Sequence, residues 1–314
     1  MFKTLFFIAA IVLNVACAFG QTAPSLETIL SEAEKQAQNY QGTFKNLLAD
    51  ETKTFEKYDK NGGLKEQNTI VSNFLVYQSA KDNNLSAELR NVVKVDGQSV
   101  PDSQKRSDAL FAELQKTNTV QRELEKIQAE GARYDKTLEV SGLTLSEAVA
   151  LSQNLRPFFD FKLLGTEKYE SNDTFVVSYQ QTKKSPFISL KGNGANSNDL
   201  SLNFFNFSLP KQLKNADVFL RGKLWIDAKT FQIWREEREL TVQADNPIVI
   251  LQTSFDYQTS DYGILVPKQI SLIANEVKKG AAKNQFTAVK DMKVDFAYSR
   301  FRKSDVDVKI LDDQ

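Results

Sequence analysis

Apolar and polar residues alternate along much of the second half of the chain, with the period of two that is typical of β-strands. The apolar members of three such rows are Val249, Leu251, Phe255 and Tyr257; Ile264, Val266, Ile270 and Leu272; and Met292, Val294, Phe296 and Tyr298. Most residues between them are polar or charged. Each of these strands is therefore expected to have one apolar face and one face in water.

The strand-like runs follow one another with short, turn-like links. They cover residues 175–181, 218–227, 231–242, 248–258, 264–277 and 289–301. Short links between consecutive strands indicate an antiparallel meander, and strands of this length tend to curl into a barrel or half-barrel. In the first half of the chain, a turn at 59–63 separates a run ending near Tyr58 from one at 68–78, and a short strand is expected at 91–95.

Helical spacing appears in four places. The apolar stripe of the first helix consists of Leu26, Ile29, Leu30, Ala33, Ala37 and Tyr40. Ser25 precedes it as the expected N-cap. Further helices are predicted at about 103–114, 120–134 and 146–154, the last ended by Pro157.

These patterns predict an α+β fold: a long-stranded antiparallel curved sheet, or half-barrel, with helices covering its concave face. The chain shows no internal repeat and no clear linker. We therefore expect residues 21–314 to form a single domain, with a helical insertion at about 103–156.

The first twenty residues have the pattern of a secretory signal peptide. Lys3 precedes an apolar run at 5–15, and Ala18 and Gly20 are small residues at positions −3 and −1 of a cut before Gln21. We expect cleavage near Gly20 and a periplasmic or secreted protein. An alternative is a lipid anchor on Cys17, as in bacterial lipoproteins. No later apolar run is long enough to span a membrane, so no transmembrane segment is expected in the mature chain.

Composition excludes several chemistries. The chain has no histidine, and its one cysteine is Cys17. Catalysis by Ser-His-Asp or Cys-His groups and metal sites built on His and Cys are therefore excluded from the mature chain. No metal and no cofactor is predicted. Acidic and basic residues number 40 each, which leaves a net charge of −1 once Lys3 is removed. Without a basic excess, nucleic acid is not an expected partner.

One segment resembles a family signature. Gly222, Trp225, Ile226 and Asp227, followed by Thr230 and Ile233, are similar to the "G-x-x-W-I-D-x-x-T-x-x-I" pattern of the periplasmic lipoprotein carriers and outer-membrane lipoprotein-sorting proteins. Residues 263–268 also resemble a "G-x-x-(V/L)-P" segment of that group. The resemblance covers about residues 215–305. It implies a half-barrel with helices in its mouth and a cavity that holds acyl chains.

The N-terminal half resembles an uncharacterised family of exported bacterial proteins. The segments that carry this second resemblance are 48–51, 72–76, 93–100 and 298–302. It implies no particular activity. The chain departs from the lipoprotein carriers in its long helical insertion and its extended N-terminal hairpin.

The predicted binding residues are the apolar members of the strand rows together with a tryptophan on a neighbouring strand. They are Trp225, Phe255, Tyr257, Ile270, Leu272, Met292, Val294, Phe296 and Tyr298. The leading interpretation is a non-enzymatic periplasmic binding protein that holds an acyl chain or a lipidated ligand in an apolar groove. The same residues would also suit ordinary packing against the covering helices.

Two other interpretations remain open. In one, the apolar face is closed by its own helices, and the protein is a structural, interaction or sensing module with an envelope protein as partner. In the other, paired carboxylates hydrolyse an envelope polymer. The charge run at 235–239 is expected to form ion pairs on the wet face of a strand, and Asp227 to form a turn.

Overall fold

The computed structural model describes residues 23–45, 47–78, 86–116, 120–135, 143–144, 148–184, 211–213, 216–244, 246–280 and 285–303. The signal-peptide region, including Cys17, lies outside them. The helices are α1 (Leu26–Phe44), α2 (Ser103–Lys116) and α3 (Val120–Gly131), with short 3-10 turns η1 (Val149–Leu151), η2 (Arg156–Phe158) and η3 (Lys211–Leu213). None of the described helices combines the length and apolar character needed to cross a bilayer.

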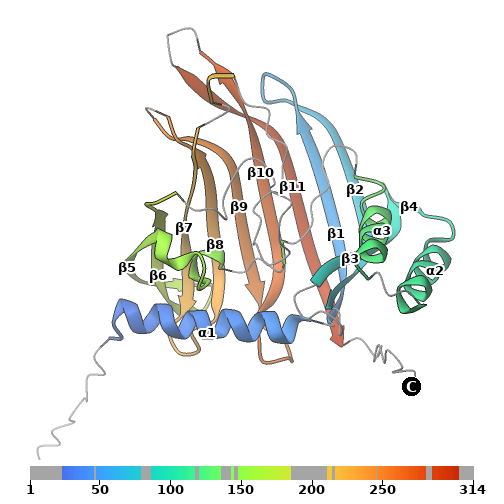
Figure 1. Cartoon of the computed structure of the whole chain (residues 1–314), viewed down its shortest axis with the longest axis horizontal. Helices are drawn as coiled ribbons and strands as arrows, with labels where there is room; N and C mark the ends of the chain where they lie inside the picture. Colours follow the sequence, from blue (N-terminus) through green and yellow to red (C-terminus); the bar gives the residue numbers. More distant parts are fainter. Residues whose placement is uncertain are drawn as a thin grey trace, which may run out of the picture.

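Eleven strands form one antiparallel sheet. They are β1 (Leu47–Tyr58), β2 (Leu64–Gln78), β3 (Ser86–Val95), β4 (Gln98–Ser99), β5 (Phe159–Tyr169), β6 (Asn172–Gln181), β7 (Val218–Asp227), β8 (Ile233–Val242), β9 (Ile248–Gln258), β10 (Val266–Lys279) and β11 (Phe286–Lys303). The order across the sheet is β4-β3-β2-β1-β11-β10-β9-β8-β7-β6-β5. The sheet is therefore two meanders joined by the pairing of β1 with β11 (Figure 1).

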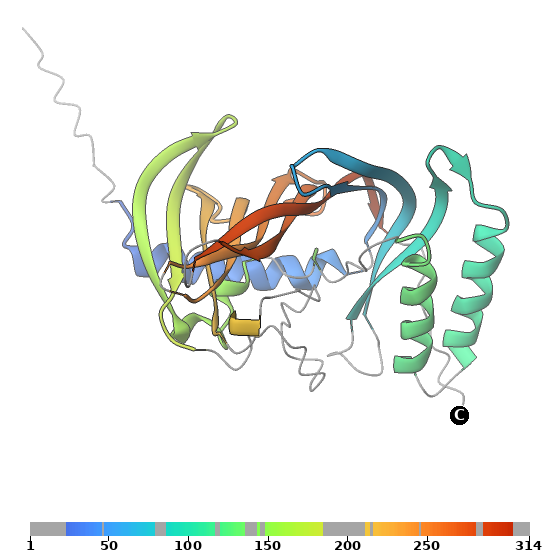
Figure 2. The ribbon, with the colours of Figure 1, turned by 90° about the horizontal axis from the view of Figure 1, so that it is seen from above.

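The sheet arches over α1 (Figure 2). We call the face toward α1 the inner face and the opposite one the outer face. Helix α1 begins at Ser25, whose hydroxyl accepts a hydrogen bond from the Thr28 backbone N–H at 3.2 Å. Its buried stripe is Ile29, Leu30, Ala33, Ala37, Tyr40 and Phe44. The expected N-cap, apolar stripe and α+β half-barrel are confirmed.

The two ends of the sheet differ. At one end α3 packs on β3, and α2 packs on both. A small apolar cluster joins them through Tyr77, Ala87, Leu89, Leu124 and Ile127. At the other end, the hairpin of β5 and β6 stands at the limit of the arch (Figure 2).

Several predicted elements need correction. Strand β5 was not expected, because its apolar residues follow no period of two. Of the helix expected at 146–154, residues 146–147 lie outside the described residues, and the rest contains only the 3-10 turn η1, since Ala148 has a positive φ of 45° that breaks helical geometry. Strand β3 begins at Ser86 rather than at residue 91. The helices expected at 103–114 and 120–134 are confirmed as α2 and α3, within two or three residues.

Candidate functional site

Eight of the nine predicted binding residues lie together on the inner face of β9, β10 and β11. In the sheet register, Phe255 is opposite Ile270, which is opposite Phe296. Leu272 and Val294 form the next pair. All eight are buried and belong to the main apolar core. The edge of the Tyr257 ring packs on Tyr40 of α1 at a centroid distance of 6.0 Å, so the first helix contributes to this surface.

Trp225 lies on the outer face, away from the other eight. Its neighbours Leu224 and Ile226 are both in the core, so the alternation of side chains along β7 turns the tryptophan to the opposite face. The indole N–H donates to the Glu167 carboxylate, and the Arg235 guanidinium lies 5.5 Å from the ring centroid. The prediction that Trp225 lines the same groove as the strand rows is therefore corrected. Whether the remaining eight residues bind a ligand stays a prediction.

A charged cluster is buried in the inner face near the β1–β3 end. Arg90 donates to Glu51 through Nε at 2.8 Å and through Nη2 at 2.9 Å, and its Nη2 also donates to Glu88 at 3.0 Å. The Thr144 backbone N–H and hydroxyl donate to the other oxygen of Glu88 at 2.7 and 2.6 Å. Because Tyr40 in turn donates to the Thr144 carbonyl at 2.7 Å, this cluster joins β1, β3, α1 and the chain at 143–144.

A second buried ion pair lies beside the first cluster. Lys53 of β1 donates to Asp135, just beyond α3, at 2.6 and 2.7 Å, and each side chain is only 1% exposed. Burial lowers the pKa of the Lys53 ammonium below its ordinary value and raises the pKa of the Asp135 carboxyl above its own. Both charges are therefore held by their mutual contact against the cost of leaving water.

A third cluster occupies the inner face of β6–β8. Glu236 accepts hydrogen bonds from Arg238 at 3.0 and 2.7 Å and from the Tyr179 hydroxyl at 2.6 Å. The Ala148 backbone N–H donates to the same carboxylate at 3.1 Å. Burial, followed by the charge of Glu236, raises the pKa of Tyr179 well above its ordinary value, so this hydroxyl acts as a donor.

Gly222 makes room for the third cluster. A Cβ at this position would collide with the Tyr179 hydroxyl and with the Glu237 carbonyl. Only glycine therefore lets the tyrosine cross β7 and reach Glu236.

The charge run at 235–239 is divided between the two faces. Arg235, Glu237 and Glu239 lie on the outer face, where the expected ion pairs form. Glu236 and Arg238 are turned inward and are buried, which corrects the expectation that the whole run is solvated. The period of two, applied to the charged residues as it was to the apolar ones, would have found this pair.

The inner face is thus closed in part by polar contacts. Thr144 and Ala148 touch it through hydrogen bonds to Glu88 and Glu236, and Arg156 of η2 binds Glu27 and Glu34 of α1 at 2.8 and 2.9 Å. The three buried carboxylates described at its centre, Glu51, Glu88 and Glu236, are each engaged by an arginine and are fully buried. This geometry gives no support to a carboxylate-dependent hydrolase.

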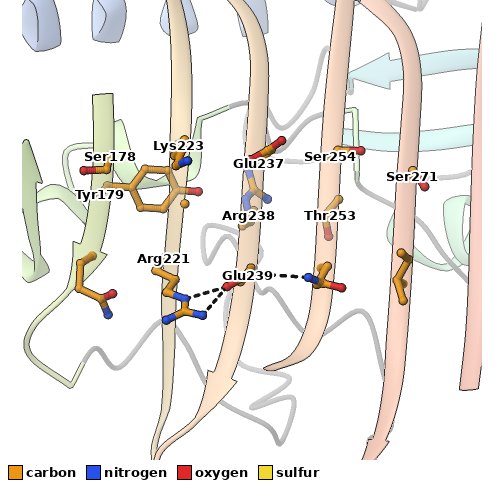
Figure 3. A pocket seen from close by; sticks show the side chains of 14 residues that line it. Ser178, Tyr179, Arg221, Lys223, Glu237, Arg238, Glu239, Thr253, Ser254 and Ser271 are labelled. Carbon is orange, nitrogen blue, oxygen red and sulfur yellow. Dashed lines mark hydrogen bonds and ion pairs between the residues drawn. The ribbon is translucent and has the colours of Figure 1, made fainter. Parts of the chain in front are cut away.

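The outer face carries a shallow polar hollow of about 590 Å³ (Figure 3). One row across it is Ser178, Lys223, Glu237, Ser254 and Ser271. In the next row, Arg221 binds Glu239 at 2.7 Å, and Gln252 donates to the same carboxylate at 3.1 Å. These groups face water and satisfy one another, as expected for the wet face of a sheet.

Asp227 forms the expected turn. Its carboxylate accepts hydrogen bonds from the backbone N–H groups of Lys229 and Thr230 at 2.9 and 2.8 Å and from the Trp234 indole at 2.9 Å. Burial alone would raise the pKa of this carboxyl, but the hydrogen bonds outweigh it and hold the pKa below its ordinary value. Among the described residues, no group of three or more acidic, histidine or cysteine side chains is placed to hold a metal.

No protein-family model matches the chain. No curated protein matches it either. Among solved structures, it is similar to an outer-membrane lipoprotein-sorting protein domain from Vibrio parahaemolyticus, at 10% identity and a TM-score of 0.37, over 88% of this chain and 94% of that one. It is also similar to a LolA superfamily protein from Nitrosomonas europaea, at 10% identity and a TM-score of 0.34, over 92% and 97% of the two chains.

A third similar structure is a DUF1329 family protein from Desulfovibrio piger, at 11% identity and a TM-score of 0.32, over 91% and 95% of the two chains. At this degree of similarity the three matches carry no conclusion about this chain.

Proposed function

We propose that this protein is a non-enzymatic binding protein of the periplasm that holds an acyl chain against the inner face of its sheet. The observation that carries the proposal is the continuous apolar surface across β9, β10 and β11, formed by Phe255, Ile270, Phe296 and the residues that flank them. Burial of an acyl chain there would contribute about 0.8 kcal/mol per methylene, which supplies affinity without any catalytic group.

Access to this surface would require part of its cover to move. Thr144 and residues 148–158 are held to the inner face and to α1 by hydrogen bonds and ion pairs, which water can replace when these residues move away. An acyl chain would then take the place of the apolar contacts that the cover provides. No catalytic step follows from this arrangement.

The first test compares two adjacent residues of β11 that point to opposite faces. Phe296→Asp places a charge on the inner face and should abolish uptake of a fluorescent fatty acid. Ala297→Asp places the same charge on the exposed outer face and should leave uptake unchanged. Because Phe296→Asp risks unfolding, circular dichroism is measured on both, and Phe296→Leu, which keeps the apolar character, should lower affinity several-fold in a folded chain.

The burial of all eight of these strand residues favours a second candidate, an interaction module with a closed core. Native mass spectrometry of protein purified from the periplasm separates the two. A co-purifying acyl species supports the binding protein. A mass without bound lipid that fatty acids and lipopeptides do not change supports the closed module instead. So does equal fatty-acid uptake by Phe296→Asp and Ala297→Asp, provided that both variants fold.

A further inference from the structure

Strand β5 is an open edge of the sheet. Seven consecutive residues, 162–168, are exposed, although they belong to an 11-residue strand. Two of the three exposed large apolar side chains of the described chain lie here, Leu163 at 37% and Leu164 at 51%. Long, apolar edge strands readily pair with another strand, because every second residue turns an unpaired N–H and C=O outward.

The opposite end of the sheet is protected from such pairing. There the edge strand β4 has two residues, and α2 and α3 pack against β3. No helix in the described part of the chain covers the β5 edge, and its pairing with β6 is interrupted by a bulge at Leu163–Gly165, where Gly165 has a φ of 136°. The bulge decides which side chains of β5 share a face.

Before the bulge, Phe161 and Leu163 point inward with their partners Tyr179 and Val177, so Lys162 points outward. After the bulge the order is reversed. Glu167 points to the outer face, where it accepts the hydrogen bond from Trp225. Lys162 and Glu167 therefore lie on the same face of one strand, one on each side of the bulge.

We propose that a second copy of this chain pairs with β5 along this edge, antiparallel and about a two-fold axis between Leu164 and Gly165. In this register Lys162 of one copy is opposite Glu167 of the other, twice across the axis. Lys162 makes no ion pair with any described residue. The cation and the carboxylate complement each other only between copies, which favours a second copy over an unrelated peptide.

The backbone supports the same register. Tyr169 and Asn172 close the two-residue turn of the hairpin and exchange hydrogen bonds within it, so Lys168 and Thr166 turn their N–H and C=O to the free edge. On the N-terminal side of the bulge, Leu163 and Phe161 also turn their backbone N–H and C=O to the free edge. The proposed axis pairs Phe161 of one copy with Lys168 of the other, and Leu163 with Thr166. Each residue whose backbone groups point to the free edge is therefore opposite another such residue. Moving the register by two residues in one direction sets Asp160 against Glu167, which repels.

The experiment is sedimentation velocity of the mature chain over about 1–200 µM. The expected result is a reversible dimer with a dissociation constant of about tens of micromolar, as for small, transient interfaces. Lys162→Glu should weaken it about tenfold or more, because two attractions become two repulsions. Lys162→Glu combined with Glu167→Lys should restore it. Lys168→Glu reverses another exposed charge of β5, on the other face, where Lys168 pairs with Asp173 of its own hairpin, and serves as the control.

A cross-link fixes the register independently. The mature chain has no cysteine, so Lys162→Cys with Glu167→Cys introduces the only two. Directly opposite residues of a non-hydrogen-bonded pair lie about 4.5 Å apart at Cα, within disulfide range. A covalent dimer under mild oxidation supports the proposal. A wild-type chain that stays monomeric over the whole concentration range overturns it. A dimer whose dissociation constant Lys162→Glu leaves unchanged overturns it as well. Neither result depends on whether an acyl chain binds the inner face.

Discussion

The Lys53–Asp135 pair shows how a single buried contact can hold two elements that are distant in sequence. It joins the central strand β1 to Asp135, a few residues beyond the end of α3, with both side chains out of water. Such a pair costs much desolvation and offsets it only while both partners are present. The pair therefore stabilises the fold only while both side chains are present, and either charge buried alone would lower the free energy of unfolding.

Lys53→Met is accordingly expected to lower the free energy of unfolding by about 3–5 kcal/mol at neutral pH. The loss follows from the Asp135 carboxylate, which is left buried without a counter-ion. The double variant Lys53→Met with Asp135→Leu should unfold within about 1 kcal/mol of the wild type, or be more stable. Urea denaturation of the wild type, both single variants and the double variant measures this cycle.

The pH dependence gives a separate check on the same pair. The folded-state pKa of Asp135 is already raised by burial, and removal of Lys53 raises it further. A carboxyl with a raised folded-state pKa loses its stability contribution as pH rises through that pKa and regains it on acidification. The deficit of Lys53→Met should therefore shrink as pH falls from 7 toward 5. A deficit that is constant over this range would contradict the assignment.

Single residues also show where sequence patterns suffice and where they do not. The period of two placed Phe255, Ile270 and Phe296 correctly on one face, because the burial of alternate side chains dominates a long strand. Trp225 was placed wrongly because it was grouped with residues of other strands, although Leu224 and Ile226 on either side of it lie in the core and the alternation along β7 turns it outward. The buried cluster around Arg90 could not be predicted either, because its members come from β1, β3 and residue 144, which only the folded chain brings together.

At the scale of elements, β7 depends on one glycine. Gly222→Ala is expected to lower the free energy of unfolding by about 1–3 kcal/mol or more, because the new methyl group displaces Tyr179 from Glu236. Gly42→Ala is the matched control. Gly42 lies in α1 with no atom near its added Cβ, so alanine there should stabilise the chain by up to about 1 kcal/mol. Equal losses for both variants in thermal denaturation would rule out the specific collision.

Elements with a strong repeating pattern were the predictable ones. Helix α1 and strands β7, β9 and β11 combine a clear period with a recognisable cap or turn. Strand β5 has neither, because it is exposed on both faces over most of its length and carries a bulge. A strand shows alternating apolar and polar residues because one of its faces is buried. A strand that buries few side chains therefore has no such pattern from which it could be predicted.

At the scale of the whole molecule, the sheet depends on the pairing of β1 with β11 (Figure 1). A chain that ends at Lys279 lacks β11, and both β1 and β10 then lose a neighbour in the middle of the sheet. We expect this truncated chain to show no cooperative thermal unfolding. A chain that ends at Lys303 keeps all eleven strands and should unfold like the full-length protein. A cooperative transition in the shorter chain would show that each meander is stable alone.

The pairing of β1 with β11 also means that folding cannot be completed before β11 has been synthesised. The ribosome makes β1 first among the strands and β11 last, yet these two are neighbours at the centre of the sheet. Until β11 has been synthesised, the nascent protein therefore lacks its complete sheet and the core that the sheet encloses. The signal peptide predicted at 1–20 would direct this chain through a membrane as an extended polypeptide, and for such a chain this delay is an advantage. Its topology postpones the compact state until nearly the entire polypeptide is available on one side.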